Sequence, residues 1–281
     1  MKNTLLILTA LLAEASPIIK FYKLRQDKKF KSLYCNGGYN VKLLVTGVGF
    51  KNTQLSINKY LSDNKISYQN FIINIGSAGA TPDSGEIGEL FYINKITDDK
   101  SGKYFFPDIL YKHNMKESSL TTVQEHAIEG KSNCSGLFDM EASAIWQSFK
   151  TKISAHKMIF LKIISDHLDI QYFDRLGFEK LVTKLIENKL LKITNFLDTL
   201  KTISLNDVPL IQKHENLLLN KIILNLRLTE SQKIKLLQLS ENNKYFNKNI
   251  HKLVFEYSNI KANDKHHRNK TFKQICELLS T

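Results

Sequence analysis

Three carboxylates lie at the edges of apolar segments, where acidic side chains often act as general acids and bases. Asp166 follows the apolar run 158–164, Glu141 lies in the stretch 138–144 (Phe-Asp-Met-Glu-Ala-Ser-Ala), and Glu14 follows the apolar run 5–13. Pairs of such groups cleave bonds to sugars, because one protonates the leaving group and another stabilises the sugar cation or activates water. An apolar wall favours the protonated form of a carboxyl, which suits Asp166 to the role of acid.

Each acid also has an ordinary structural interpretation. Asp166 could cap the helix that follows it, and spacing alone favours that interpretation. Glu141 could be an acidic residue in the first turn of a helix, where the macrodipole favours it. Glu14 could be a solvent-exposed glutamate at the start of a helix. Position in the sequence does not decide between the catalytic and the structural interpretation of each acid.

Two glycine turns are predicted beside the apolar segments. The stretch 74–80 (Asn-Ile-Gly-Ser-Ala-Gly-Ala) follows the apolar run 71–73, and the stretch 47–49 (Gly-Val-Gly) follows a predicted strand. Small residues allow the backbone to approach a ligand closely. Ordinary tight turns have the same composition, so these glycines are compatible with a binding site without requiring one.

In this order along the chain, these stretches and Ile163-Ile164-Ser165-Asp166 resemble the nucleoside phosphorylase and nucleosidase superfamily. The closest pattern is that of methylthioadenosine/S-adenosylhomocysteine nucleosidase, an enzyme that cuts the bond between a purine and its ribose. The resemblance covers roughly residues 1–195. It implies a purine nucleosidase that acts with water on an adenosine-type nucleoside, a small-molecule ligand.

The resemblance implies a role for each acid. Asp166, oriented by Ser165, would deliver a proton to purine N7 as the base leaves. Glu141 would anchor the ribose hydroxyls and stabilise the sugar cation, and Met140 would pack against the sugar or base. Glu14 would polarise the attacking water.

The resemblance also implies residues that border the substrate. Ser77, Ala78 and Gly79 would flank the base and the ribose or phosphate region, and Gly47 would line the far side. Val123 lies in the stretch 120–126, which corresponds to the segment that stacks an aromatic side chain on the purine in the family. This stretch has no aromatic residue, so the stacking side chain would come from elsewhere; the candidates are Phe105, Phe106 and Phe138.

The acceptor of the ribosyl group is either water or phosphate. A phosphorylase holds its phosphate dianion with arginine forks. Bacterial purine phosphorylases of this superfamily have an arginine just before the Gly-Ser turn, where this chain has Asn74. Lys51 near the 47–53 loop keeps phosphorolysis as the alternative, but the pattern favours hydrolysis.

Alternating apolar runs and helical patterns predict a layered α/β fold with a central mixed sheet flanked by helices. Strands are predicted at 4–10, 31–35, 41–46, 70–75, 89–96, 119–124 and 157–164. Helices are predicted at 14–25, 51–63, 139–150 and 172–198, with Pro17 in the first turn of the first helix. The polar segment 98–118 is predicted to be a loop or short hairpin near the mouth of the site.

The strand pattern ends near residue 200, and the chain is predicted to have two domains, 1–198 and 199–281. The second is an all-helical appendage, and Thr229 with Gln232 form a predicted capping box at the start of one of its helices. This appendage motivates a third hypothesis, a catalytically weak nucleoside-binding module whose helical tail docks a partner. Packing within the chain or a dimer contact is the simpler role for its apolar faces.

Composition limits the remaining classes of function. The 281 residues carry a net charge of +13, spread over both parts of the chain, so a nucleic-acid role is disfavoured. No apolar run is long enough to span a membrane. Three widely separated cysteines exclude a compact metal site and indicate a reduced cytoplasm. We expect no metal or cofactor, and the resemblance implies a homo-oligomer.

The N-terminal run 5–13 has two interpretations. It has the composition of a short signal peptide, and it also fits a buried first strand that turns into a helix. We favour the strand, partly because the first strand of the family also ends in a glutamate-bearing turn.

Overall fold

The computed structural model describes residues 5–36, 40–64, 66, 70–124, 136–169, 174–206, 211, 213–245 and 250–280. The chain divides into two compact units, Met1–Asn206 and Asp207–Thr281. The boundary predicted after residue 198 therefore falls inside helix α4, Arg175–Asn206. Among the described residues, no helix is both long enough and apolar enough to cross a lipid bilayer.

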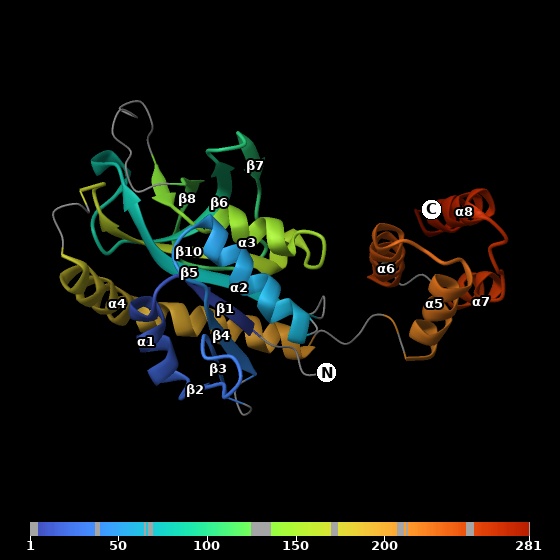
Figure 1. The fold of residues 1–281 in the computed structure, drawn as a ribbon, viewed down its shortest axis with the longest axis horizontal. Coiled ribbons are helices and arrows are strands. Elements are labelled where there is room, and N and C mark those ends of the chain that lie inside the picture. Colours follow the sequence, from blue (N-terminus) through green and yellow to red (C-terminus); the bar gives the residue numbers. More distant parts are fainter. Residues whose placement is uncertain are drawn as a thin grey trace. The chain divides into compact units, whose positions relative to one another are not determined.

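The first unit is built on one mixed sheet, which has ten strands among the described residues (Figure 1). Its strand order is β10-β6-β8-β9-β5-β1-β4-β3-β2, and β7 pairs with β6. Strand β10 also pairs with β5, so strands β5, β10, β6, β8 and β9 close into a ring. The strands are β1 Leu5–Thr9, β2 Arg25–Gln26, β3 Leu33–Asn36, β4 Val41–Val45, β5 Phe71–Ala80, β6 Leu90–Asp98, β7 Lys103–Phe105, β8 Lys116–Thr122, β9 Leu137–Asp139 and β10 Met158–Asp166.

The central strands are buried on both faces because their sequences are apolar at nearly every position. All five residues of β1 and all nine of β10 are buried. Alternate side chains point to opposite faces, so Ile7 and Ile159 join one apolar cluster, and Leu6 and Phe160 join another. The chain thereby forms two cores, one on each side of the sheet.

Helices cover both faces of this sheet, which confirms the predicted layered α/β architecture. Helices α1 (Leu12–Phe21) and α4 pack together on one face, and α2 (Phe50–Asp63) and α3 (Ala142–Phe149) pack together on the other (Figure 1). Two short 3-10 helices, η1 Pro82–Ser84 and η2 Ala155–Lys157, connect the strands.

Helix α1 begins two residues earlier than predicted, so Pro17 lies beyond its first turn. Proline has no N–H to donate to the carbonyl oxygen four residues earlier, which here belongs to Ala13. That oxygen accepts a hydrogen bond of 3.1 Å from the Thr183 hydroxyl of α4 instead. The side chain of a neighbouring helix therefore supplies the missing donor.

The stretch 74–80 is strand rather than turn, which corrects the prediction. Strand β5 runs on to Ala80 because its backbone pairs with β10 along its whole second half, with Gly76 opposite Lys162 and Gly79 opposite Asp166. Within the segment 98–118, residues 98–105 close a short hairpin between β6 and β7, and residues 106–115 form neither helix nor strand; residues 116–118 already belong to β8.

The second unit is all-helical in its described residues, as predicted. It consists of α5 Lys213–Asn225, α6 Glu230–Tyr245, α7 His251–Ser258 and α8 Lys265–Ser280. These helices bury a core of their own, which includes Leu219, Ile222 and Val254. The predicted capping box at α6 is confirmed, because the backbone N–H of Thr229 donates to Gln232 Oε1 (3.1 Å) and the N–H of Gln232 donates to Thr229 Oγ1 (3.3 Å).

Candidate active site

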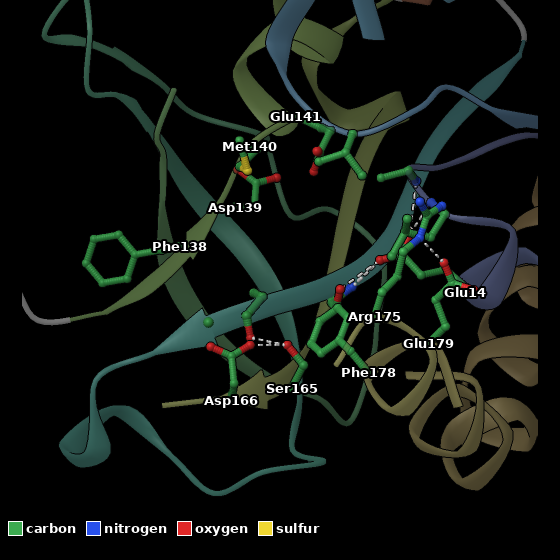
Figure 2. Close-up of a pocket in the computed structure, with 16 residues that line it drawn as sticks. Glu14, Phe138, Asp139, Met140, Glu141, Ser165, Asp166, Arg175, Phe178 and Glu179 are labelled. Atoms are coloured by element: carbon green, nitrogen blue, oxygen red, sulfur yellow. Dashed lines mark hydrogen bonds and ion pairs between the residues drawn. The ribbon is translucent and has the colours of Figure 1, made fainter. Parts of the chain in front are cut away.

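A cleft of about 500 Å³ opens where the carboxyl ends of β1, β5 and β10 meet the loop before α3. Ligands bind at this edge of open α/β sheets. Figure 2 shows Glu141, Asp166 and Glu14 on three sides of the cleft. The lining residues are Ala10, Leu11, Glu14, Val48, Ser77, Ala78, Gly79, Phe138, Asp139, Met140, Glu141, Ser165, Asp166, Arg175, Phe178 and Glu179.

Asp166 ends β10 and is 5% exposed. Its Oδ1 accepts the N–H of Leu168 at 3.0 Å, and its Oδ2 lies 2.6 Å from the Ser165 hydroxyl. That hydroxyl also lies 3.2 Å from the carbonyl oxygen of Ala78. Ser165 has one proton for two acceptors, so it can donate to an ionised Asp166 or, when Asp166 is protonated, accept its proton and donate to Ala78. The pair accommodates both protonation states without moving a heavy atom.

Helix capping is not the role of Asp166. Helix α4 begins at Arg175, and the carboxylate in front of it is Asp174, whose Oδ2 accepts the N–H of Gly177 at 3.3 Å. A Cβ at Gly79 would lie 2.7 Å from Leu168 Cδ2 and 3.1 Å from Asp166 Oδ1. Glycine at this position of β5 therefore leaves room for both side chains.

Glu141 immediately precedes α3 and is 6% exposed. The carboxylate of Glu141 does not cap α3. Its Oε1 accepts the backbone N–H of Gly49 at 2.7 Å. Gly49 has a φ of +90°, a conformation that favours glycine. Burial and the nearby carboxylate of Asp139 raise the pKa of Glu141 to about 7, against the opposing effects of Lys162 and the Gly49 N–H.

Lys162 lies in the middle of β10 and forms a buried ion pair with Asp139, 2.8 Å between Nζ and Oδ2. Burial lowers the pKa of Lys162, but the carboxylates of Asp139, Glu141 and Glu14 together outweigh burial and raise it. Asp139 also accepts the hydroxyl of Thr122 (2.7 Å) and the N–H of Ala142 at the start of α3 (2.9 Å). The Lys162–Asp139 pair therefore links β8, β10 and the start of α3 next to Glu141.

Glu14 is 2% exposed, so it is not a solvent-exposed helix-start residue. Its Oε2 accepts the N–H groups of Ala10 (2.8 Å) and Leu11 (3.1 Å), and its Oε1 accepts the N–H (2.7 Å) and hydroxyl (2.9 Å) of Ser77. A Cβ at Gly76 would lie 2.9 Å from Oε1. These four donors match the capacity of a carboxylate and fix its position between β1 and β5.

The structure gathers most of the predicted residues at the cleft, including Met140, Ser77, Ala78, Gly79 and Ser165. Two predicted residues do not line it. Gly47 lies one residue before Val48, which does, and its N–H donates to the carbonyl of Ala10. Val123 is buried behind the wall, where its N–H donates to the carbonyl of Asp139; residues 125 and 126 of its stretch lie outside the described part of the chain.

Several lining residues were not predicted. Arg175, Phe178 and Glu179 share one face of α4 by helical spacing, and the Nε of Arg175 lies 3.0 Å from Glu179 Oε1. Among the described residues, two aromatic side chains line the cleft, Phe178 and the predicted candidate Phe138 (Figure 2). The other candidates lie elsewhere, because Phe105 lines a separate cavity and Phe106 is 58% exposed.

Among the described residues, no three or more histidine, cysteine, aspartate or glutamate side chains are grouped so that they could hold a metal ion. The described side chains that line the cleft offer carboxyl groups, the hydroxyls of Ser77 and Ser165, and the guanidinium of Arg175.

Protein-family models give no match to this chain, and neither do curated proteins. Solved structures do match. They include a 5′-methylthioadenosine nucleosidase from Arabidopsis thaliana, with 19% identity over 70% of this chain and 96% of that one and a TM-score of 0.57. A 5′-methylthioadenosine/S-adenosylhomocysteine nucleosidase from Campylobacter jejuni has 15% identity over 70% and 99% of the two chains and a TM-score of 0.56.

A nucleosidase from Chlamydia trachomatis, solved as a variant bound to methylthioadenosine, has 20% identity over 69% of this chain and 98% of that one, with a TM-score of 0.52. In each case nearly the whole of the known structure is matched. The chain therefore has the fold of the methylthioadenosine/S-adenosylhomocysteine nucleosidases.

Proposed function

We propose that the chain is a purine nucleosidase that hydrolyses the N-glycosidic bond of an adenosine-type nucleoside such as methylthioadenosine or S-adenosylhomocysteine. The observation that carries the proposal is the convergence of Asp166, Glu141 and Glu14 on one cleft of about 500 Å³. A cleft of this size suits a small organic ligand. The neighbours described above are nucleosidases, and that from Chlamydia trachomatis is bound to methylthioadenosine.

Asp166 is the proposed general acid. It would donate its proton to purine N7 while the bond to ribose breaks, and the neutral base would leave. Ser165 keeps the carboxyl in one orientation through the 2.6 Å contact. Phe138 and Phe178 line the cleft and are proposed to pack on the base.

Glu141 is the proposed ribose anchor. One of its oxygens is occupied by the N–H of Gly49, which leaves the other for the sugar hydroxyls. A carboxylate beside the ribosyl cation stabilises it most when water is excluded. Because the pKa of Glu141 is about 7, the positive charge of Lys162 is needed to keep a large fraction ionised at neutral pH.

Glu14 is the proposed base, and it would act through Ser77. All four acceptor positions of Glu14 are occupied, one of them by the Ser77 hydroxyl. Water bound in the cleft would donate to Ser77 Oγ, and as the water attacks, Ser77 would take that proton and pass its own to Glu14. This relay moves one proton in each step and needs no displacement of the carboxylate.

Water is the proposed acceptor rather than phosphate. Asn74, at the position of the phosphorylase arginine, carries no charge; it is 2% exposed, and its Nδ2 donates to the carbonyl of Leu8 at 3.1 Å. Lys51 does not line the cleft, and the lining guanidinium of Arg175 is paired with Glu179. Arg175 is nevertheless the observation that keeps phosphorolysis as the second candidate.

Incubation with a panel of purine nucleosides, with and without phosphate, tests this proposal through detection of the free base. Hydrolysis predicts equal rates of base release in both buffers and, as the second product, the free sugar with its 5′ substituent. Release that requires phosphate and yields the 1-phosphate of that sugar would identify a phosphorylase. Saturable binding of the nucleosides with no release from any of them would identify a binding module.

We also propose that the protein forms a homo-oligomer. The segment after β7 exposes large apolar side chains, Phe106 at 58% and Leu110 at 69%, together with Tyr104 of β7 at 58%. Apolar groups exposed close together often mark contacts between proteins. Size-exclusion chromatography with light scattering measures the oligomeric state, and a monomer at micromolar concentration would contradict this proposal.

A further inference from the structure

A second cavity, of about 240 Å³, lies outside the cleft and shares none of its lining residues. Four parts of the first unit form it: the β6–β7 hairpin with Lys100 and Lys103, the end of α3 with Lys150, the start of α2 with Phe50, and Gln124 just after β8. The three lysines are exposed, so they form a cationic rim at the mouth of the cavity.

The carboxylate of Asp98 also borders the cavity, but it already accepts hydrogen bonds from other residues of the protein. Its Oδ2 accepts the hydroxyl of Ser143 (2.7 Å) and the Nε2 of Gln147 (3.2 Å), and its Oδ1 accepts the N–H of Ser101 (2.8 Å). Burial raises the pKa of Asp98, but these donors outweigh burial and hold it below its usual value. One negative charge against three lysines leaves the cavity with an excess of positive charge.

Phe105 and Phe50 give the cavity apolar wall surface beside its polar lining. Phe105 is 9% exposed, and its ring stacks on that of Trp146, with centroids 5.7 Å apart and an interplanar angle of 22°. Exposed lysines beside this aromatic surface suit a ligand with an anionic head and a small organic part. The volume is below that of typical sites for drug-sized molecules, so the ligand must be small.

We propose that this cavity binds a phosphate group, free or carried by a small monoester, with Lys100, Lys103 and Lys150 as its cationic partners. Lysine ammonium groups bind phosphate oxygens through charge-assisted hydrogen bonds. Lysines that converge on a recessed surface also concentrate anions there more effectively than scattered surface charges do. The site lies outside the proposed nucleosidase cleft and does not depend on that function.

The fluorescence of Trp146 can report binding at this site, because Trp146 is the one tryptophan of the chain and its ring stacks on that of Phe105. The experiment titrates the full-length protein with inorganic phosphate and, separately, with glycerol 3-phosphate at constant ionic strength. Tryptophan fluorescence and titration calorimetry follow each titration, with chloride as the reference anion. A saturable response to phosphate, but not to chloride, is the expected result, and tighter binding of either probe identifies the free or the esterified form as the better ligand.

The test variant is Lys100→Gln/Lys150→Gln, and the matched control is Lys28→Gln/Lys29→Gln, two exposed lysines between β2 and β3. We expect the test variant to bind phosphate about tenfold more weakly or worse, equivalent to about 1.4 kcal/mol, and the control to bind as the wild type does. Equal binding by the test variant, or no saturable response in either measurement, would overturn the proposal. Circular dichroism spectra of both variants verify that they are folded.

Discussion

Glu141 is expected to lower the stability of the protein at alkaline pH, because its pKa is raised from 4.5 to about 7 by burial and by Asp139. The folded state holds a proton that the unfolded chain has lost between these two pH values. Stability from this group is therefore fully present below pH 4.5 and is lost as the pH rises through about 7. Each pKa unit corresponds to about 1.4 kcal/mol, so the loss amounts to roughly 3 kcal/mol at pH 8.

The substitution Glu141→Gln isolates this effect. Glutamine retains an oxygen for the 2.7 Å hydrogen bond from the Gly49 N–H, but it carries no charge. We expect the variant to be up to about 3 kcal/mol more stable than the wild type at pH 8 and equally stable near pH 4.5. We also expect it to lose base release, because the ribose anchor would no longer be anionic.

Urea unfolding followed by the fluorescence of Trp146 measures this difference, since the one tryptophan of the chain lies on α3 in the first unit. The matched control is Glu187→Gln, which neutralises an exposed glutamate of α4 and should leave the pH dependence unchanged. If Glu141→Gln is no more stable than the wild type at pH 8, the reasoning about burial at this site is wrong.

Three further predictions concern the residues that support the cleft and the second unit. Lys162→Met should destabilise the protein by about 3–5 kcal/mol in urea unfolding, because it leaves the buried charge of Asp139 without its cationic partner, and Lys162→Met/Asp139→Asn should recover most of that loss. Gly76→Ala should reduce base release by about tenfold to a hundredfold in steady-state assays, since its Cβ would lie 2.9 Å from Glu14 Oε1 and would displace that carboxylate. Thr229→Ala should cost the second unit about 1 kcal/mol through loss of the capping box, visible in thermal unfolding by circular dichroism but not in Trp146 fluorescence. A stable Lys162→Met, a fully active Gly76→Ala or an unchanged Thr229→Ala would each contradict the contact on which it rests.

The architecture and the position of the acids follow from local sequence features. Strands β1 and β10 are apolar at most positions, and such runs become central strands of a layered sheet. Both strands are parallel to β5, so their carboxyl ends lie at the same edge of the sheet. Asp166 at the end of β10 and Glu14 after β1 lie at that edge. Glu14 and Asp166 could therefore be expected near one another before their contacts were known.

The extent of β5 and the wall formed by α4 depend on contacts between distant segments. The glycines and small residues of 74–80 indicate a turn locally, but pairing with β10 keeps them extended. Arg175, Phe178 and Glu179 lie in an ordinary amphipathic pattern, and only the packing of α4 directs that face to the cleft. Neither the length of β5 nor the contribution of α4 to the cleft can therefore be predicted from the local sequence.

Lys162 is different, because the sequence does contain a signal for it. A lysine in the middle of the apolar run 158–164 must be buried if that run is a central strand, and a buried charge needs a partner. The pattern therefore predicts an acidic residue facing it, which the structure identifies as Asp139. The identity of that partner depends on the pairing of β8 with β9 and could not be read locally.

The most direct test of the central proposal compares Asp166→Asn with Asp83→Asn, a matched change at an exposed aspartate of η1. Base release from methylthioadenosine, measured by chromatography, should fall by about a hundredfold or more in Asp166→Asn, because the amide keeps the shape of the side chain but has no proton to give. Asp83→Asn should retain wild-type turnover. Near-normal turnover by Asp166→Asn would contradict the assignment of Asp166 as the acid that releases the base.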